Sequence, residues 1–354
     1  MNTNKQRKTS FDNPLKEDLD HILYHTRDLW DEFRGQNIFI TGGTGFLGSW
    51  MLESFLWANN KLDLKARATV LTRSPEAFLK KTPHLVTDPA VILYKGDVQS
   101  FDFPAGSFSH VIHMATESKS IEKVEDSFKT LDVIINGTRR VLDFSITHDV
   151  SKLLFLSSGA VYGKQQSDVL NVTEDYKGGP DLESMESTYG EGKRVGELLC
   201  RLYYLKYGIE CKIARGFAFA GPYIPLDGHF AFGNFINDVL NNRDILIKGD
   251  GTTIRSYLYA ADAAIWFWTI LCKGKPVYPY NVGSDNPVTI LELANKIKAI
   301  IKSGSQVVVL NKSISNKTDR YVPSTLRAQK ELGLKQYIGL DQSIEKTFFY
   351  FNMK

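Results

Sequence analysis

The sequence has few cysteines and no long hydrophobic run. Its three cysteines, Cys200, Cys211 and Cys272, are an odd count without CxxC spacing, so neither a zinc site nor a disulfide framework is indicated. The densest apolar segment, AAIWFWTIL at residues 263–271, is too short to span a bilayer, and the first residues lack the apolar core of a signal peptide. These absences predict a cytoplasmic protein without a metal centre or a membrane partner.

A strong charge of either sign is also missing. The chain has 43 Lys and Arg against 40 Asp and Glu, a formal net charge of +3, and no basic stripe along a predicted helix. Nucleic acid is therefore not an expected partner. With 354 residues, of which 43% are hydrophobic, the chain is long enough for two domains or for one large domain with a smaller lobe.

Short apolar segments alternate with helical patterns in the first part of the chain. Strands are predicted at residues 37–41, 66–72, 90–97, 110–115 and 152–158, and helices at 48–60 and 124–148. This order is typical of an α/β protein with a Rossmann-type, doubly wound parallel sheet. Such a sheet has helices on both faces and a ligand crevice at the carboxyl ends of its strands.

The alternation fails beyond about Gly221, where prolines and glycines separate shorter elements. We therefore expect an N-terminal extension at 1–35 and a dinucleotide-binding domain at 36–220 plus about 255–281. A smaller C-terminal α/β substrate lobe would take up 221–254 and 282–354.

The extension contains an amphipathic helix. Asn13 followed by Pro14 is a helix-start signal, and apolar residues then recur at helical spacing: Leu15, Leu19, Ile22, Leu23, Trp30 and Phe33. Such a face can bind a partner, but it more often packs on the core of its own protein. We expect it to pack on the body of this chain.

The segment NIFITGGTGFLGSW places Gly42, Gly45 and Gly48 between the first strand and the next helix. Gly42 permits a tight turn, Gly45 lets backbone amides approach a pyrophosphate, and Gly48 lets helix and strand pack closely. Glycines alone are a weak signal, but the readable strand before them and helix after them supply the required context. The loop predicts a bound NAD or NADP.

The end of the second strand bears on the choice between these two cofactors. An Asp or Glu there usually binds the ribose hydroxyls of NAD, whereas this chain has Thr72 and Arg73. A guanidinium suits a 2′-phosphate, so NADP stays open beside NAD, although Arg73 could instead stack on the adenine or lie in solvent. Asp97, which ends a later strand, suits the adenine amino group or serves as an ordinary turn residue.

A serine, a tyrosine and a lysine follow in a pattern that carries chemistry. Tyr189 and Lys193 lie four residues apart on a predicted helix, hence on one face. An ammonium beside a phenol favours the phenolate and lowers the tyrosine pKa toward neutrality, which suits an acid/base that interconverts alcohol and ketone. Ser158, at the end of the strand KLLFLSS, would hydrogen-bond the reacting oxygen.

These segments together resemble the extended short-chain dehydrogenases/reductases of the NAD-dependent epimerase/dehydratase family, which act on nucleotide sugars. The resemblance runs from Asn37 to the C-terminus and includes TGGTGFLG, GDV, HMAT, NGTRRVL, SSGAVYG, YGEGK, GPY, GDGTTIRSYLYAAD and NVGSDNPVTILELA. It implies that Ser158, Tyr189 and Lys193 form a catalytic triad. It also implies a nucleotide-diphosphate sugar as substrate and a homodimer through the long helices around 124–135 and 189–199.

The resemblance assigns binding roles as well. Asn136 would support the active-site lysine, and Asn234, Arg255 and, as a weaker candidate, Arg320 would hold the nucleotide and its diphosphate. The residues implied to bind the cofactor are Gly42, Thr44, Gly45, Phe46, Leu47, Gly48, Thr72, Arg73, Asp97, Val98, Met114, Ala115, Thr116, Asn136, Tyr189 and Lys193. Ser158 and Glu117 would contact the sugar.

The reaction is indicated by two positions without reactive side chains. In the 4,6-dehydratases the two residues after the catalytic Ser or Thr are the Asp and Glu that expel water, and glucuronate decarboxylases keep a Glu there. Here these positions are Gly159 and Ala160. The remaining reactions need only hydride transfer and one proton: epimerisation through a transient 4-keto sugar, or 4-keto reduction with NADPH or 4-hydroxyl oxidation. We rank the epimerase first, above a dehydratase and above a non-catalytic dinucleotide sensor.

Two more positions bear on the substrate. Glu117, in HMATESKSI, resembles a residue that dehydratases carry at this strand end, and it either binds a sugar hydroxyl or lies in a surface loop. Ala218, in RGFAFAGPY, stands where relatives usually have an Asn that bonds the sugar or phosphate. The binding mode of the sugar therefore departs from the family pattern.

Overall fold

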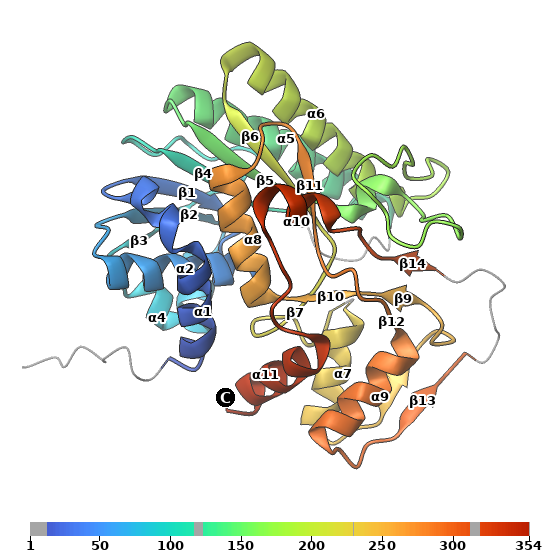
Figure 1. Ribbon diagram of the computed structural model, residues 1–354. Helices are drawn as coiled ribbons and strands as arrows, with labels where there is room; N and C mark the ends of the chain where they lie inside the picture. Colours follow the sequence, from blue (N-terminus) through green and yellow to red (C-terminus); the bar gives the residue numbers. More distant parts are fainter. Residues whose placement is uncertain (1–12, 117–122, 229, 312–318, 354) are drawn as a thin grey trace, which may run out of the picture.

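The computed structural model describes residues 13–116, 123–228, 230–311 and 319–353, and its centre is a seven-stranded parallel sheet (Figure 1). The strands are β1 (Asn37–Thr41), β2 (Arg67–Thr72), β3 (Val91–Lys95), β4 (His110–His113), β5 (Lys152–Ser158), β6 (Glu210–Gly216) and β11 (Pro279–Val282). Their order is β3-β2-β1-β4-β5-β6-β11, and all neighbours pair in parallel. The prediction of a doubly wound α/β sheet is therefore confirmed.

The strand order reverses between β1 and β4, because the chain runs outward from β1 to β3 and then returns to the other side of β1. A reversal of this kind opens a crevice at the carboxyl ends of the strands, where α/β proteins bind their ligands. Short helices leave this edge: α3 (Pro75–Lys81) and α4 (Pro83–Val86) after β2, and the 3-10 helix η2 (Gly159–Tyr162) after β5.

Helices cover both faces of the sheet (Figure 1). On one face α2 (Phe46–Leu62) and α8 (Ala260–Lys273) bury most of their residues, among them Trp50, Trp266 and Trp268. On the other face α5 (Val124–Thr147) and α6 (Ser187–Tyr207) pack side by side over a core that includes Phe144, Phe155 and Cys200. The sheet is thus buried on both sides, as a parallel sheet requires.

The N-terminal extension packs on α2 and α8. It forms α1 (Lys16–Thr26) and the 3-10 helix η1 (Arg27–Phe33), and it adds buried side chains to the same core: Leu15, Leu19, Ile22, Trp30 and Phe33. The expectation that this amphipathic segment packs on the body of the chain is confirmed. Within the described residues, no helix combines the length and the apolar character needed to cross a membrane.

A second lobe with its own hydrophobic core lies below the sheet in Figure 1. Its helices are α7 (Ala231–Leu240), α9 (Ile290–Ile301) and α11 (Leu340–Asn352), while α10 (Leu326–Leu332) contacts β11. Its short strands are β7 (Ala218–Ala220), β8 (Ile245–Ile247), β9 (Ile254–Arg255), β10 (Tyr257–Tyr259), β12 (Val288–Thr289), β13 (Val307–Val309) and β14 (Arg320–Tyr321). Strand β14 pairs with β9 and sets Tyr321 beside Arg255.

Candidate active site

A cavity of about 900 Å³ lies at the carboxyl ends of the central strands and reaches the second lobe. The predicted site residues that line it are Gly42, Thr44, Gly45, Phe46, Leu47, Gly48, Thr72, Arg73, Asp97, Val98, Met114, Ala115, Thr116, Ser158, Tyr189, Lys193 and Arg255. Residues that are far apart in the sequence therefore meet at the edge that the strand order defines. Glu117 lies outside the described residues.

The glycine loop leaves no room for side chains. Gly42 has a φ of +73°, and a Cβ on it would come within 2.5 Å of the Met114 carbonyl carbon. A Cβ on Gly48 would lie 2.2 Å from the Gly42 carbonyl oxygen. Gly45 precedes the first residue of α2, a helix of 17 residues. This tight turn at a helix N-terminus fits the pyrophosphate of a dinucleotide.

His113 links the end of β1 to α5, a role that the sequence pattern does not reveal. Its Nδ1 lies 2.7 Å from Thr41 Oγ1 at the end of β1, and its Nε2 lies 3.1 Å from Thr138 Oγ1 of α5. Burial lowers the pKa of His113 to about 3. The ring is therefore neutral at physiological pH and holds two elements together without carrying charge.

The end of β2 brings two cationic side chains to the cavity. Thr72, Arg73 and Ser74 line the cavity, and so does Lys81 of α3. Burial lowers the pKa of Lys81, and this lysine has no carboxylate partner among the described residues. Asp97 also lines the cavity, and its Oδ1 accepts hydrogen bonds from the backbone and side chain of Gln99. Asp97 thus caps a turn and faces the cavity at once.

The structure brings Ser158, Tyr189 and Lys193 together. Ser158 ends β5, and its Oγ accepts a hydrogen bond from the Ala160 amide at 3.1 Å. Lys193, only 2% exposed, donates from Nζ to the Leu156 carbonyl at 2.7 Å and lies 5.7 Å from the centre of the Tyr189 ring. The predicted triad therefore faces one cavity, with the lysine fixed to β5.

The pKa of Tyr189 differs from the expectation. Burial raises it, and the Ser158 hydroxyl opposes this effect only in part. Burial also lowers the pKa of Lys193 to about 8. The prediction that this lysine brings the tyrosine pKa toward neutrality is therefore wrong for the protein alone, because desolvation disfavours the charged form of both groups.

The space next to Gly159 is already filled. A Cβ on Gly159 would lie 2.6 Å from Phe217 Cζ and 2.7 Å from Tyr321 Oη. The rings of Phe217 and Tyr321 pack on each other with centres 4.6 Å apart. An acidic side chain at position 159 would have to displace both rings, so the packing of the rings excludes an acid or base at this position.

Three predicted residues do not reach the cavity. Asn136 is exposed on α5, whereas Lys193 is buried and bound to Leu156, so the prediction that Asn136 supports Lys193 is wrong. The buried face of α5 has a helical period that includes Ile134 and Gly137 but leaves Asn136 outside.

Asn234 and Arg320 form hydrogen bonds outside the cavity. Asn234, on α7, donates from Nδ2 to the Gly228 carbonyl at 3.0 Å and so holds the loop that follows β7. Arg320 donates from Nε to the Leu170 carbonyl, and its neighbour Tyr321 faces the cavity instead, because successive strand residues point to opposite sides. The expectation that Asn234 and Arg320 contact the nucleotide directly is corrected. Arg255 does line the cavity, and its Nη2 lies 2.6 Å from Asp319 Oδ2.

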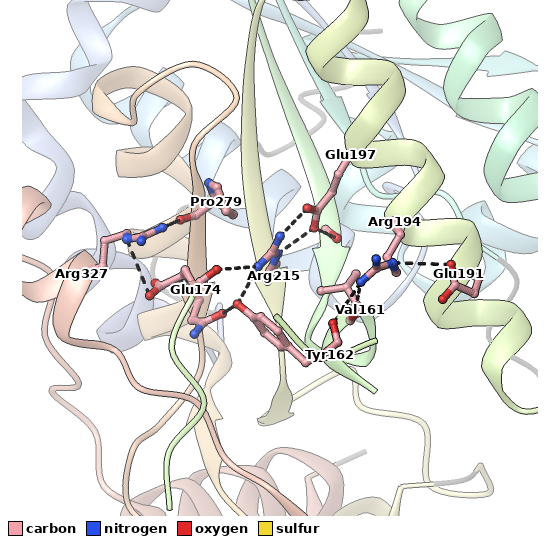
Figure 2. A network of polar contacts seen from close by, with 12 residues as sticks. Val161, Tyr162, Glu174, Glu191, Arg194, Glu197, Arg215, Pro279 and Arg327 are labelled. Carbon is pink, nitrogen blue, oxygen red and sulfur yellow. Dashed lines mark hydrogen bonds and ion pairs between the residues drawn. The ribbon is translucent and has the colours of Figure 1, made fainter. Parts of the chain in front are cut away.

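A partly buried ion pair between Glu197 and Arg215 lies close to the triad (Figure 2). Glu197, one turn after Lys193 on α6, accepts two hydrogen bonds from Arg215 of β6 and one from Ser157 of β5. Arg215 also donates to Tyr162 Oη at 2.8 Å. Sequence reasoning missed this network, although the spacing of Tyr189, Lys193 and Glu197 at every fourth residue places them along one helix face.

These features define a class of protein. A glycine loop at the sheet's switch point, a serine at the end of β5 and a Tyr-Lys pair on α6 are the site of an extended short-chain dehydrogenase/reductase. The chain belongs to the NAD dependent epimerase/dehydratase family, whose sequence profile matches residues 38–283. The family predicted from the sequence is therefore confirmed.

Curated relatives are similar over most of the chain. UDP-glucuronic acid decarboxylase 6 of Arabidopsis thaliana is 28% identical over 307 residues, which are 87% of this chain and 86% of that protein. UDP-glucuronic acid decarboxylase 1 of Danio rerio is 26% identical over 317 residues, with 90% and 73% covered. These relatives add the decarboxylases to the reactions to be weighed.

Solved structures share the fold. UDP-glucose 4-epimerase of Thermotoga maritima, solved with UDP-glucose, superposes with a TM-score of 0.77 at 21% identity and covers 90% of this chain and 99% of its own. UDP-glucuronic acid 4-epimerase of Bacillus cereus, solved with UDP-glucuronic acid and NAD, has a TM-score of 0.76 at 22% identity, with 90% and 99% covered. The chain therefore shares the fold of these two epimerases.

The burial of Lys193 predicts a pH-dependent stability. Its pKa falls from 10.5 to about 8, so between these values the unfolded chain binds more protons, and folding becomes more favourable as pH rises. From about pH 7 to about pH 9.5 the wild type should gain about 2 kcal/mol of unfolding free energy relative to Lys193→Met, measured by urea unfolding. Lys80→Met, on the exposed side of α3, is the control. A difference that stays constant with pH would contradict the prediction.

Proposed function

We propose that this protein is a nucleotide-sugar epimerase that acts through a transient 4-keto sugar. The observation that carries the proposal is the closed space beside Gly159, where Phe217 and Tyr321 stand next to a complete Ser-Tyr-Lys triad. Hydride transfer needs the triad and a dinucleotide, whereas by the family pattern elimination also needs an Asp and a Glu at positions 159 and 160, and decarboxylation needs a Glu there. The similarity to decarboxylases is therefore outweighed by Gly159 and Ala160.

Each member of the triad has a separate task in this proposal. Tyr189 takes the proton of the sugar hydroxyl as the carbonyl forms and returns it when the hydroxyl is restored. Ser158 donates a hydrogen bond to the same oxygen. With a dinucleotide bound, the Lys193 ammonium and the positive charge of an oxidised nicotinamide would together favour the phenolate, against the desolvation that raises the Tyr189 pKa in the protein alone. The bound dinucleotide supplies the hydride acceptor and donor, which the glycine loop and the cavity walls would hold.

A second candidate is an NADPH-dependent 4-keto-sugar reductase. It is favoured by the cations at the end of β2, because Arg73 and Lys81 line the part of the cavity where a 2′-phosphate would lie. An epimerase returns its hydride and retains the cofactor, whereas a reductase must exchange it. The cofactor preference therefore separates the two candidates.

We also propose that the active protein is a homodimer that works in the cytoplasm. Apolar side chains lie exposed on α5 and α6: Phe128 (67% exposed), Leu198 (54%), Leu202 (51%) and Leu205 (67%). A second copy that pairs the same two helices would cover them, as in an isologous interface. The three free cysteines suit a reducing compartment.

The reaction is tested with a panel of UDP-, dTDP-, GDP- and CDP-sugars, and the products are identified by NMR. We expect interconversion of C4 epimers without net oxidation of the cofactor. Tyr189→Phe should lower kcat about 10²-fold to 10⁴-fold because the proton carrier is removed. Tyr203→Phe, on the same helix but bound to Asp143 away from the cavity, should retain activity. Release of CO₂, or a 4-keto-6-deoxy product, would overturn the proposal.

The cofactor preference is tested by titrating the protein with NADPH and NADH and following the tryptophan fluorescence. If the cations bind a 2′-phosphate, Arg73→Ala and Lys81→Ala should each weaken NADPH about ten-fold or more and leave NADH unchanged. Lys80→Ala, a neighbouring lysine outside the cavity lining, is the control. Equal affinities for both cofactors in all variants would show that these cations do not bind a 2′-phosphate, and would remove the observation that favours the reductase.

The dimer is tested by sedimentation equilibrium. Leu202→Glu should shift the protein toward monomer because it places a charge in an apolar interface. Leu246→Glu, at an exposed leucine on β8 of the second lobe (47% exposed), should not. A wild type that is monomeric at micromolar concentration, or a dimer unaffected by Leu202→Glu, would contradict the proposed interface.

A further inference from the structure

Tyr321 reaches the catalytic serine from the second lobe. It lies 163 residues after Ser158, and the pairing of β14 with β9 carries it to the cavity wall. Its ring packs on Phe217 and stands 5.8 Å from the Arg255 guanidinium carbon. None of the sequence patterns discussed above includes this tyrosine.

The hydroxyl of Tyr321 forms a short chain of hydrogen bonds with the site. Its Oη lies 3.4 Å from the Gly216 carbonyl oxygen and 3.3 Å from Ser158 Oγ. A carbonyl oxygen only accepts, so Tyr321 donates to Gly216 and the Ser158 hydroxyl donates to Tyr321. The lone pairs of Ser158 Oγ then remain for the Ala160 amide, which donates to it at 3.1 Å, and for Tyr189.

We propose that Tyr321 is a positioning residue of this active site, which sets the direction of the Ser158 hydroxyl and completes the catalytic edge only when the second lobe is in place. The proposal rests on the proposed function for the reaction in which Ser158 works. When a sugar oxygen accepts a hydrogen bond from the Ser158 hydroxyl, the Tyr321 hydroxyl can rotate. It then donates to Ser158 Oγ instead of to the Gly216 carbonyl. The two hydrogen bonds then point the same way and strengthen each other.

A role of Tyr321 as a second acid/base is excluded by its surroundings. Burial raises the pKa of its phenol well above the ordinary value, and the nearby Arg255 offsets this only in part. Lys193 lies near the ring of Tyr189, whereas the cation beside the Tyr321 ring is the Arg255 guanidinium. Tyr321 therefore stays protonated and acts through Ser158.

A double-mutant cycle distinguishes positioning from mere packing. Tyr321→Phe keeps the ring that fills the space beside Gly159 and removes only the hydroxyl. It should lower kcat roughly ten-fold, with the dissociation constant of the cofactor and the melting temperature unchanged. In a Ser158→Ala background the same change should cause no further loss, since Tyr321 acts through Ser158. Tyr337→Phe is the control. Tyr337 stacks on His25 of α1 and does not line the cavity, so this variant should have wild-type kinetics.

The proposal is overturned if Tyr321→Phe has no effect on kcat, or if its effect is equally large with and without Ser158. The cycle is read in whichever hydride-transfer reaction the product analysis identifies, so an unexpected product contradicts the proposed function and not the role of Tyr321.

A measurement without substrate covers the case in which no sugar reacts. In protein labelled with ¹³Cζ-tyrosine, the Tyr189 signal is assigned by its loss in Tyr189→Phe. Removal of the Tyr321 hydroxyl frees Ser158 to donate to Tyr189, so Tyr321→Phe should lower the pKa of Tyr189 when Ser158 is present and leave it unchanged in Ser158→Ala. A pKa of Tyr189 that does not change in either background would overturn the proposal.

Discussion

The partly buried ion pair of Arg215 and Glu197 holds the catalytic edge together. Both side chains are 13% exposed, and their bidentate contact joins β6 to α6. Ser157 ties β5 to the same carboxylate, and Tyr162 ties η2 to the same guanidinium (Figure 2). An ion pair at this depth is costly to desolvate and is retained only where its geometry satisfies the charges. Here it fixes the relative positions of the strand that carries Ser158 and the helix that carries Tyr189 and Lys193.

The shape of the site also depends on glycines, which have no side chain to fill space. Gly42 and Gly48 let the loop after β1 close against β4 and α2, and Gly159 lets two aromatic rings approach the catalytic serine. The absence of a Cβ at these positions thus has two consequences. At the loop, the lack of side chains leaves backbone amides accessible to a pyrophosphate. At Gly159, the rings of Phe217 and Tyr321 occupy the space that an acidic side chain would need.

The parts of the site that the sequence predicted are those set by local geometry. The glycine spacing, the serine at a strand end and the four-residue spacing of Tyr189 and Lys193 depend on neighbours along the chain, and parallel pairing brings them to one edge. Tyr321, Arg215 and His113 were missed because their partners lie far away in the sequence, and no periodic pattern marks such contacts. Asn136 was misplaced for a related reason, since a one-residue difference on a helix changes the direction of a side chain by about 100°. The raised pKa of Tyr189 depends on burial, which spacing does not report.

The N-terminal segment carries a further consequence. Asp18 of α1 accepts a hydrogen bond from Tyr259 at the start of α8 and pairs with Lys346 of α11 at 2.9 Å. One short helix therefore touches both the sheet-bound half of the molecule and the lobe that delivers Tyr321. The predicted N-terminal extension at 1–35 thus contacts both parts of the folded protein through α1. Removal of residues 1–35 would therefore break contacts to both parts of the molecule, and it would expose Trp57 and Trp268, which now contact Asp20 and Trp30.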